Sequence, residues 1–589
     1  MKTRMFFLFP LLRWSLAATS AQISEPLKVI PPWTPVTVKT NAAGVEVGVW
    51  GRTHKLIGAL PHSIVTAGSE VLAVPVRFIG KVSGRPIEWK RGGNFVFRAD
   101  ESHAIVSGWL AGDDLIVNTT TRIEFDGVMR LDLVVLPQHK KTPKLEQLWL
   151  EIPLRRDCAT LFHYWPGRWG SAKNSGAVPE AGLRLPFKPF VWLGWEDGGL
   201  GWFAESDKGW QPQSAERAIE VALQANEVVL RLRLLDSTAR LPITFTMGLQ
   251  ATPVKPWPAD FHEWRICHGA SYSTDEKQLQ RAAELGVKTL VFHEHWTPYQ
   301  NYPFTMHETE LNRLVERCHN RGIKLLLYHG YEFSSLAPEW ADWAEQVLVK
   351  SASGTYAGGY HRQPEQRDYM VCYRSHYRDF LLQGVRSALE RYGYDGLYLD
   401  GTTEPWACCN ERHGCGYRAG DGSLKPTYPI FAVRKLMHGL AAAIRPRGGL
   451  INAHQSTCCV TPTLAFADSY WDGEQFAQGE LTKNALVQLL LERSRFNRQL
   501  NPLRHSGRCG KAACHPCDWE QRQHLTRQML NALDGFCKHR AGLADRGAAR
   551  SGKRPLAVTR IIRAHREGEG GWVAVDNGPT LPMPWLDVF

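Results

Sequence analysis

Long apolar segments and several common catalytic signatures are missing from this 589-residue chain. Beyond the N-terminus, no run reaches the ~18 apolar residues that a membrane-spanning helix requires. No Gly-rich phosphate loop, no G-x-S-x-G elbow in a strand–turn–helix setting and no H-E-x-x-H helix appears. We therefore expect no membrane span, and the sequence argues against kinases, dinucleotide-dependent dehydrogenases, serine esterases and zinc proteases.

A basic stripe is also missing, although the net charge is +12. The first 21 residues contribute +3 and residues 501–589 contribute +6, which leaves +3 for everything between them. Nucleic-acid binding needs clustered Lys and Arg to neutralise phosphates. The nearly neutral body of the chain therefore excludes nucleic acid as the expected partner.

The N-terminus has the pattern of a secretory signal peptide. "MKTRMFFLFPLLRWSLAATSAQ" begins with basic residues, continues with an apolar stretch and ends in small residues. Arg13 interrupts the apolar stretch, so a buried N-terminal segment is the alternative. We expect a signal peptide at 1–21 and a secreted or periplasmic protein, in which disulfides can form. The 13 cysteines are odd in number and cannot all pair internally.

Residues 25–255 are predicted to form an all-β sandwich domain. Short alternating runs are separated by Gly, Pro and Asp turns, as in "VEVGVWGR", "SEVLAVPVRFIG", "TRIEFDGVMRLDLVVL" and "EVVLRLRLL". The segment "FVWLGWEDGGLGWFAESDKGW" (190–210) favours a hairpin whose tryptophans pack between the sheets. The other interpretation is a sugar-contacting edge. The Pro-rich stretch 252–261 follows the last strand and is the predicted linker.

Residues 262–500 are predicted to form a catalytic (β/α)₈ TIM barrel. Apolar strands alternate with helical segments, and so many βα units in series favour a barrel over an open sheet. Six strand candidates occur by residue 476, so the last two would lie in 501–589. That segment loses clear periodicity. It is either a divergent or incomplete end of the barrel or a poorly determined tail.

Polar residues close the apolar strands of the predicted barrel, where active sites of such barrels lie. The strand ends and their loops supply, in order, His293, Glu294, His295 and Trp296; Tyr328, His329 and Glu332; Asp400, Glu404 and Trp406; Asn452, His454 and Gln455; and Asp468, Trp471, Asp472 and Glu474. A single polar residue at a strand end can simply be a hydrogen-bonded residue of the core. Five strand ends that converge on His, carboxylate and aromatic residues predict an active site.

The chemistry expected at this site is cleavage of a glycosidic bond by two carboxyl groups. One carboxyl group protonates the leaving oxygen, and the other attacks the anomeric carbon or activates water. Asp400 is the predicted nucleophile, with Gly401 keeping backbone bulk away from the substrate. Glu474, or Asp472, is the predicted acid/base. Glu404 is the competitor for that role, and a retaining outcome is preferred.

The remaining strand-end residues are expected to bind the sugar: His293, Glu294, His295, Trp296, Tyr328, His329, Glu404, Trp406, His454, Gln455, Asp468 and Trp471. His293 and His295 lie on one side of a strand, but sugar-hydroxyl binding is favoured over a metal, with Trp296 as a stacking platform. Cys509, Cys514 and Cys517 with His515 lack a completing ligand pair for zinc. We expect no cofactor and no metal.

Cysteines also gather in the loops near the predicted site. Cys408, Cys409 and Cys415 follow the fourth strand, and Cys458 and Cys459 follow the fifth. If the protein is exported, we expect at least one disulfide, either between these neighbouring loops or from Cys415 to Cys408 or Cys409. Reduced thiols in a cytoplasmic protein are the alternative.

Four motifs together resemble a group of bacterial glycoside-hydrolase-like proteins: the Trp-rich hairpin at 190–210, "HEHWTPYQNYP", "GLYLDGTTEPWACCNERHGCGY" and "FADSYWDGEQF". These proteins have an N-terminal domain similar to that of glycoside hydrolase family 123, followed by a TIM barrel. The resemblance covers roughly residues 30–500. The adjacent Asp-Glu pair of family 123 is absent, because Asp400 and Glu404 are separated, so the substrate-assisted mechanism is not carried over. Asp400 looks similar by position to the nucleophile of α-galactosidase-like barrels.

The sequence therefore predicts an exported glycoside hydrolase that acts on a poly- or oligosaccharide. The alternative is a non-catalytic carbohydrate-binding protein built on a glycosidase-like barrel. A metal-dependent hydrolase based on the His cluster is a weaker third possibility.

Overall fold

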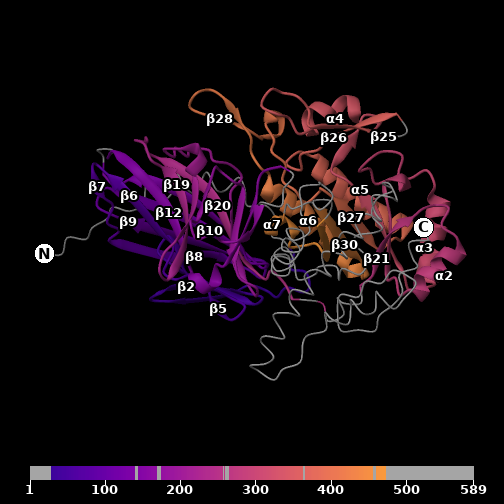
Figure 1. Cartoon of the computed structure of the whole chain (residues 1–589), viewed down its shortest axis with the longest axis horizontal. Coiled ribbons are helices and arrows are strands. Elements are labelled where there is room, and N and C mark those ends of the chain that lie inside the picture. Colours follow the sequence, from indigo (N-terminus) through magenta and orange to yellow (C-terminus); the bar gives the residue numbers. More distant parts are fainter. Residues whose placement is uncertain are drawn as a thin grey trace, which may run out of the picture.

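Two parts of the chain lie side by side: a region of antiparallel sheets and a region built on a parallel sheet (Figure 1). The computed structural model describes residues 28–139, 143–168, 174–256, 258, 264–362, 365–455 and 459–472. The predicted signal peptide at 1–21 and the segment 501–589, which was expected to hold the last two barrel strands, lie outside these residues.

The N-terminal part contains three antiparallel sheets, one more than the two of a simple sandwich. A five-stranded sheet runs in order β1 (Thr37–Asn41), β2 (Gly44–Val49), β3 (Arg52–Ile57), β4 (Leu60–Thr66), β5 (Ser69–Glu70). A nine-stranded sheet runs β14 (Ser175–Ala177), β13 (Leu161–Trp165), β16 (Phe190–Gly194), β17 (Gly199–Phe203), β20 (Ile243–Thr252), β11 (Val128–Pro137), β10 (Leu115–Glu124), β9 (His103–Ala111), β8 (Arg91–Ala99). A six-stranded sheet runs β15 (Leu183–Leu185), β18 (Ile219–Leu223), β19 (Glu227–Leu235), β12 (Leu145–Arg155), β6 (Arg77–Val82), β7 (Arg85–Pro86).

The core of this part follows from period-two alternation along the strands. In β10 every second residue is buried, beginning with Leu115 and ending with Ile123, as expected for a strand with one face on the core. The Trp-rich segment forms the predicted hairpin, because β16 and β17 pair antiparallel. Trp192 and Trp202 are fully buried, which confirms that they pack inside rather than forming a sugar-contacting edge.

The C-terminal part is built on six parallel strands in the order β21 (Ile266–Ala270), β22 (Thr289–Phe292), β23 (Lys324–His329), β27 (Gly396–Asp400), β30 (Leu450–Gln455), β31 (Ser469–Asp472). All five neighbouring pairs are parallel. These strands are the six strand candidates of the sequence, and they form a half-barrel sheet. Their apolar residues are buried without alternation, as in β22, because helices cover a parallel sheet.

The helices of this part are α2 (Glu276–Glu284), α3 (Glu308–His319), α4 (Trp340–Val347), α5 (Tyr377–Tyr392), α6 (Ile430–Ile444) and α7 (Thr461–Leu464). Local signals fix some of their ends. Asp275 and Gln278 form a capping box at the start of α2, and Gly393 ends α5 in the left-handed conformation. Among the described residues, no helix is long and apolar enough to span a bilayer.

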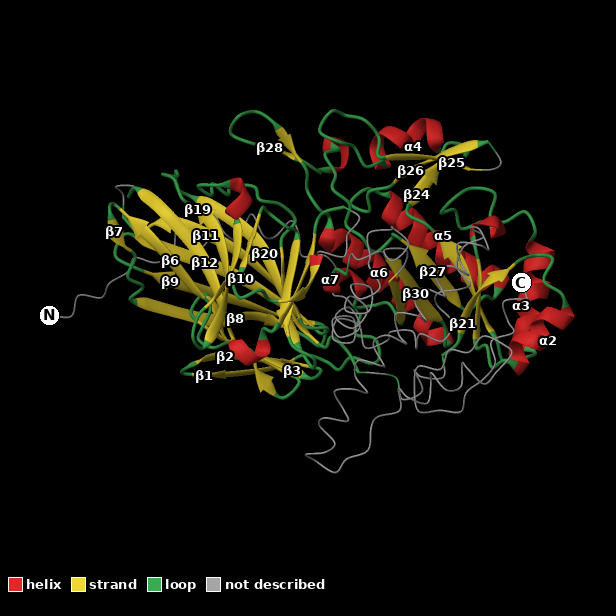
Figure 2. Cartoon of the chain, in the orientation of Figure 1, coloured by secondary structure: helices red, strands yellow, loops and turns green. Residues whose placement is uncertain are grey.

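A small insertion follows β23 and stands beyond the carboxyl ends of the parallel strands (Figure 2). It contains α4 and a three-stranded antiparallel sheet of β24 (Glu332–Ser334), β26 (Gln366–Met370) and β25 (Gly358–Arg362). The loop after β27 adds a two-stranded ribbon of β28 (Tyr417–Arg418) and β29 (Leu424–Lys425). Short 3-10 turns lie at Arg156–Cys158, Ala215–Arg217, Glu294–Trp296, Glu411–His413 and Arg445–Arg447.

Arg434 joins the two parts through a buried ion cluster. This α6 side chain lies 2.6 Å from Glu124, the last residue of β10, and 2.5 Å from Asp126, two residues further on. Burial opposes ionisation of Glu124, but Arg434 and Arg122 outweigh it and lower the pKa of Glu124 to about 2. The predicted linker also packs tightly, because Val254 and Lys255 are buried. Phe125, Trp192 and Val254 belong to the same hydrophobic core as the parallel sheet, whereas the rest of the antiparallel part has a core of its own.

We expect Arg434→Ala to lower the free energy of unfolding by about 3–5 kcal/mol, because it removes the ion-pair partner of buried Asp126 and leaves Glu124 with Arg122 alone. Urea denaturation of the full chain measures this change. Arg418→Ala is the control, since Arg418 and its partner Glu411 are exposed and such pairs contribute at most about 1 kcal/mol. Equal stability losses in both variants would contradict the buried-cluster account.

Candidate active site

Asp400 lies at the carboxyl end of β27, between residues delivered by its two neighbouring strands. The Tyr328 hydroxyl on β23 donates a hydrogen bond of 3.0 Å to Oδ2. Nδ1 of His454 on β30 lies 3.0 Å from Oδ1. The Asp400 side chain keeps 23% of its surface exposed. Asp400 is thus held on both oxygens and still open to solvent.

The charge of Asp400 is stabilised by these contacts. Burial disfavours the ionised form, but the His454 imidazole and the Tyr328 hydrogen bond outweigh it and lower the pKa of Asp400 to about 2. Gly401, the next residue, has φ +62, and a Cβ there would lie 2.4 Å from the Tyr331 ring. The glycine therefore serves close packing against Tyr331, rather than the substrate clearance that was expected.

Aromatic and imidazole rings surround Asp400. The ring centroids of His293 and Tyr328 are 4.2 Å apart, and those of His268 and Tyr398 are 4.5 Å apart in a T-shaped contact. Tyr398 also stacks on His454 at 6.0 Å. Burial lowers the pKa of His293 to about 4, so this imidazole is neutral near pH 7.

A second carboxyl group, Glu332 on β24, is connected to Asp400 through two polar side chains. Gln300 Nε2 donates both to the Tyr328 hydroxyl, at 3.2 Å, and to Glu332 Oε2, at 3.4 Å. The backbone N–H of Tyr331 donates to the same oxygen at 3.0 Å. A Cβ at Gly330 would lie 2.3 Å from that oxygen, so only glycine fits beside the carboxyl group.

Glu332 has the opposite protonation preference from Asp400. Burial raises the pKa of Glu332 to about 8, and the charges of Asp400 and Asp368 add to this effect. Hydrogen bonds from Gln300 and the Tyr331 N–H oppose it only in part. The two carboxyl groups therefore differ at neutral pH: Asp400 is ionised, and Glu332 is mostly protonated.

Arg362 on β25 faces three carboxyl groups. Its guanidinium lies 2.6 Å from Asp368, 3.3 Å from Glu332 and in direct contact with Glu294. Burial raises the pKa of Asp368 to about 6, although Arg362 opposes the shift. One cation shared among three acids cannot neutralise all of them, which is consistent with the raised pKa of Glu332.

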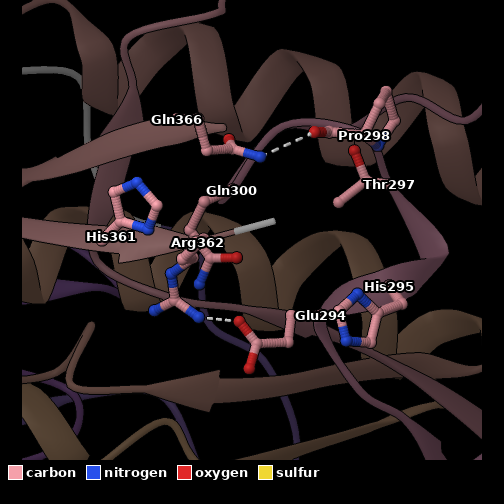
Figure 3. A pocket seen from close by; sticks show the side chains of 8 residues that line it. All are labelled: Glu294, His295, Thr297, Pro298, Gln300, His361, Arg362 and Gln366. Carbon is pink, nitrogen blue, oxygen red and sulfur yellow. Dashed lines mark hydrogen bonds and ion pairs between the residues drawn. The ribbon is translucent and has the colours of Figure 1, made fainter. Parts of the chain in front are cut away.

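A small polar cavity of about 240 Å³ opens beside this arginine (Figure 3). Its lining comes from the loop after β22 and from the β25–β26 hairpin: Glu294, His295, Thr297, Pro298, Gln300, His361, Arg362 and Gln366. Figure 3 shows Arg362 and Glu294 facing each other across one side and Gln366 bonded to the Pro298 carbonyl. Gln300 connects the cavity with the Asp400 cluster.

The structure brings together Asp400, His293, Tyr328 and His454 from the predicted set, with Glu294 and His295 in the adjacent cavity. Trp296 and His329 are not available to a ligand, because both are fully buried. The 3-10 turn after β22 points Trp296 inward, where its Nε1–H donates to the Tyr328 carbonyl. Trp296 is therefore no stacking platform.

Glu404 and Trp406 follow Asp400 but lie inside the loop. Glu404 is only 1% exposed and Trp406 is 6% exposed. Trp406 stacks on Tyr331 at 5.2 Å, and its Nε1–H donates to the Gly401 carbonyl. Both side chains support the wall of the site rather than forming its open surface.

Asp468 lies at the amino ends of the parallel strands, away from Asp400, and not at the carboxyl ends where its predicted role in sugar binding would place it. It precedes β31, accepts the N–H of Ile451 at the start of β30 and pairs with Arg445. The backbone register places Trp471 opposite His454, and Asp472 opposite Gln455. Glu474 lies outside the described residues, so its acid/base role stays a prediction.

Sequence reasoning missed Arg362, Asp368 and Gln300, and it named Glu332 without a role. Gln300 follows the "FHEHW" motif within a few residues, so the loop itself was a signal. Arg362 and Asp368 belong to the short strands of the insertion, which no periodicity indicates.

The cysteines in this region do not form the predicted disulfide. All eight cysteines within the described residues are free thiols, including Cys408, Cys409, Cys415 and Cys459. Cys458 lies outside those residues, so pairing of that residue stays untested.

The fold thus places antiparallel β-sheets ahead of a parallel half-barrel sheet, with the Asp400 site at the carboxyl ends of the parallel strands. Residues 43–182 match the family model described as Glycoside hydrolase 123, third domain. This match confirms the resemblance to a domain of glycoside hydrolase family 123 over these residues. The matched segment contains none of the candidate site residues. No curated protein matches the sequence.

Solved glycosidase structures also resemble the chain. An α-N-acetylgalactosaminidase from Bifidobacterium bifidum has 12% identity, covering 75% of this chain and 82% of its own, with a TM-score of 0.34. An α-galactosidase from Thermus thermophilus has 13% identity, with coverage of 68% and 87% and a TM-score of 0.36. A family 31 dextranase from Flavobacterium johnsoniae has 10% identity, with coverage of 78% and 64% and a TM-score of 0.39. At such low TM-scores, these similarities carry no argument about this chain.

We expect Glu332→Gln to change how stability depends on pH. The pKa of Glu332 is raised from 4.5 to about 8 in the folded protein. Between these two pH values Glu332 is protonated in the folded state and ionised in the unfolded state. Stability therefore falls as pH rises through this range, with a slope approaching about 1.4 kcal/mol per pH unit.

Urea denaturation of wild type and Glu332→Gln between pH 6 and pH 8 measures this contribution. The variant should lose that part of the slope, because Gln has no proton to release. Glu365→Gln is the matched control, since the Glu365 side chain, between β25 and β26 in the same insertion, is 74% exposed. Identical slopes in wild type and Glu332→Gln would show that Glu332 is ionised throughout.

Proposed function

We propose that this protein is an exported glycoside hydrolase that cleaves a poly- or oligosaccharide with two carboxyl groups. The proposal includes a β-sandwich domain over 25–255 and a catalytic domain over 262–500, closed into a (β/α)₈ barrel by strands after β31. Asp400 is the nucleophile of a retaining reaction. The carbohydrate is its only proposed partner.

The observation that carries this proposal is the opposed protonation of two connected carboxyl groups. Asp400 has a pKa lowered to about 2, and Glu332 has one raised to about 8. Environments that separate the pKa values of two nearby acids are characteristic of glycosidic cleavage, where one group must be ionised and another must hold a proton. The family 123 domain at 43–182 supports the same class.

In this mechanism Asp400 attacks the anomeric carbon and forms a covalent glycosyl-enzyme. Tyr328 and His454 orient its carboxylate, because each engages a different oxygen. The leaving oxygen takes a proton from the second carboxyl group. Water then attacks the intermediate, and the same group accepts the proton of that water.

The sequence assigns the proton donor to Glu474 or Asp472, and the structure adds Glu332 as a further candidate. The Glu332 side chain is only 2% exposed, so it reaches the leaving oxygen only if the insertion around β24 shifts when substrate binds. A specific observation favours Glu332: the charge of Asp400 is one cause of its raised pKa. Forming the glycosyl ester removes that charge, so the pKa of Glu332 falls. A group that begins as an acid then becomes a better base, as the second half of the reaction requires.

The adjacent cavity is the proposed subsite for a sugar ring. Glu294 and Gln366 offer acceptors, and Arg362 and Gln300 offer donors, within about 240 Å³. Sugar hydroxyls both donate and accept hydrogen bonds, so such a mixed lining matches them.

We expect wild type to release sugar from at least one substrate in a screen of aryl glycosides and polysaccharides, and Asp400→Asn to lose that activity. Azide added to Asp400→Gly should restore turnover and yield a glycosyl azide, because the small anion occupies the space of the missing carboxylate. Arg418→Ala is the control: this exposed residue touches neither Asp400 nor the cavity, so hydrolysis of aryl substrates should stay within a few-fold.

Unchanged turnover in Asp400→Asn would remove this assignment. Sugar binding without any turnover by wild type would instead favour the non-catalytic carbohydrate-binding alternative.

The proton donor is identified by comparing Glu332→Gln, Glu474→Gln and Asp472→Asn. Loss of the true donor should slow substrates with poor leaving groups by roughly 10²–10⁴-fold. Aryl glycosides with acidic leaving groups should be affected much less, because they depart without a proton. If Glu332 is the donor, the alkaline limb of the wild-type pH profile falls near pH 8, and the limb disappears in Glu332→Gln.

A further inference from the structure

Three thiols and one imidazole meet at a single buried point behind the wall of the candidate active site. Cys372 follows β26, and Cys408, His413 and Cys415 come from the loop after β27. Their ligand atoms all lie within 4.8 Å of one another. The three cysteines are almost completely buried.

We propose that Cys372, Cys408, His413 and Cys415 form a tetrahedral Cys₃His site for a zinc ion. Zn–S bonds of about 2.3 Å and Zn–N bonds of about 2.0–2.1 Å place ligand atoms roughly 3.5–3.8 Å apart in a tetrahedron. The Sγ atoms of Cys372 and Cys415 are 3.6 Å apart, and Cys408 Sγ is 3.3 Å from His413 Nε2. These separations fit ligands around one ion.

The imidazole of His413 is oriented for this role. Its Nδ1 lies 2.8 Å from the Gln346 carbonyl, which can only accept, so Nδ1 carries the proton. Nε2 is then the lone-pair nitrogen, and it faces the thiols. A metal-bound histidine is commonly fixed in this way by a hydrogen bond from its other nitrogen.

The loop around the cluster is also tied in place. The Asn410 N–H donates to Cys408 Sγ at 3.4 Å, which stabilises a thiolate. The Asn410 side chain donates to the carbonyls of Glu345 and Leu348. The site thus joins the loop after β27 to the end of α4 and the end of β26.

A disulfide does not account for this arrangement. A bonded pair has its sulfur atoms about 2.05 Å apart, well below the 3.6 Å between Cys372 and Cys415. A disulfide would also leave one thiol and the imidazole without a role. Soft thiolate ligands with one imidazole suit zinc. Cys409 is adjacent in sequence but does not belong to the four-residue group.

The proposed ion is structural, because four protein ligands leave no open position for substrate or water. The cysteines pack against Tyr331 and Trp406. Tyr331 lies against Gly401, directly after Asp400. The ion would hold the wall beside Asp400 whatever reaction occurs there, so this inference does not depend on the proposed function.

The experiment is elemental analysis of the full chain, expressed with zinc supplied and then desalted. We expect one zinc per chain in wild type and in Cys409→Ser, the matched control. Cys415→Ser and His413→Gln should fall well below one. No zinc in wild type, or unchanged zinc in both ligand variants, would overturn the proposal.

Cobalt substitution of wild type provides a measurement that does not depend on how the variants fold. Tetrahedral thiolate ligation should give intense visible d–d bands and a near-ultraviolet sulfur-to-cobalt charge-transfer band. A weak octahedral spectrum, or an intact-protein mass showing a disulfide within Cys372, Cys408 and Cys415, would also overturn the site.

Discussion

Asp400 occupies a position where burial alone would neutralise it, and its charge depends on the order of the parallel strands. β27 lies between β23 and β30, so Tyr328 and His454 approach from opposite sides. Each contacts one carboxylate oxygen. No local feature of the "LYLDG" segment could supply these partners. The parallel sheet makes the ionised carboxylate possible, and the rest of the site is arranged around it.

The negative charge of Asp400 also acts on its surroundings. It disfavours a second charge on Glu332, which Gln300 and Tyr328 connect to it. Arg362 does not cancel this effect, because Asp368 and Glu294 compete for the same guanidinium. The site thus holds a proton close to a carboxylate. Glu332 keeps its proton because the insertion supplies one arginine, Arg362, to three carboxyl groups.

The sequence predicted the six parallel strands because their apolar runs are continuous and end in polar residues. It also indicated Asp400 and His454, since each closes such a run. It failed at Asp468, because pattern alone cannot tell the start of β31 from its end. It failed at Trp296, because a 3-10 turn reverses the direction of that side chain. The sequence did not predict that Arg362 and Asp368 belong to the site, since the β25–β26 hairpin is short and largely polar and shows no strand pattern.

The cysteines show the same limit of local patterns. Cys408, Cys409 and Cys415 are close in sequence, which favoured pairing among themselves. The fold instead brings Cys372 from the end of β26 and turns His413 toward the thiols. Cys409, one residue from Cys408, stays out of the group. The proposed zinc ion would cross-link the loop after β27 to the end of β26. Trp406 and Tyr331 lie between that cross-link and Asp400. Such an ion would therefore hold the surroundings of the carboxylate in place through two stacked rings.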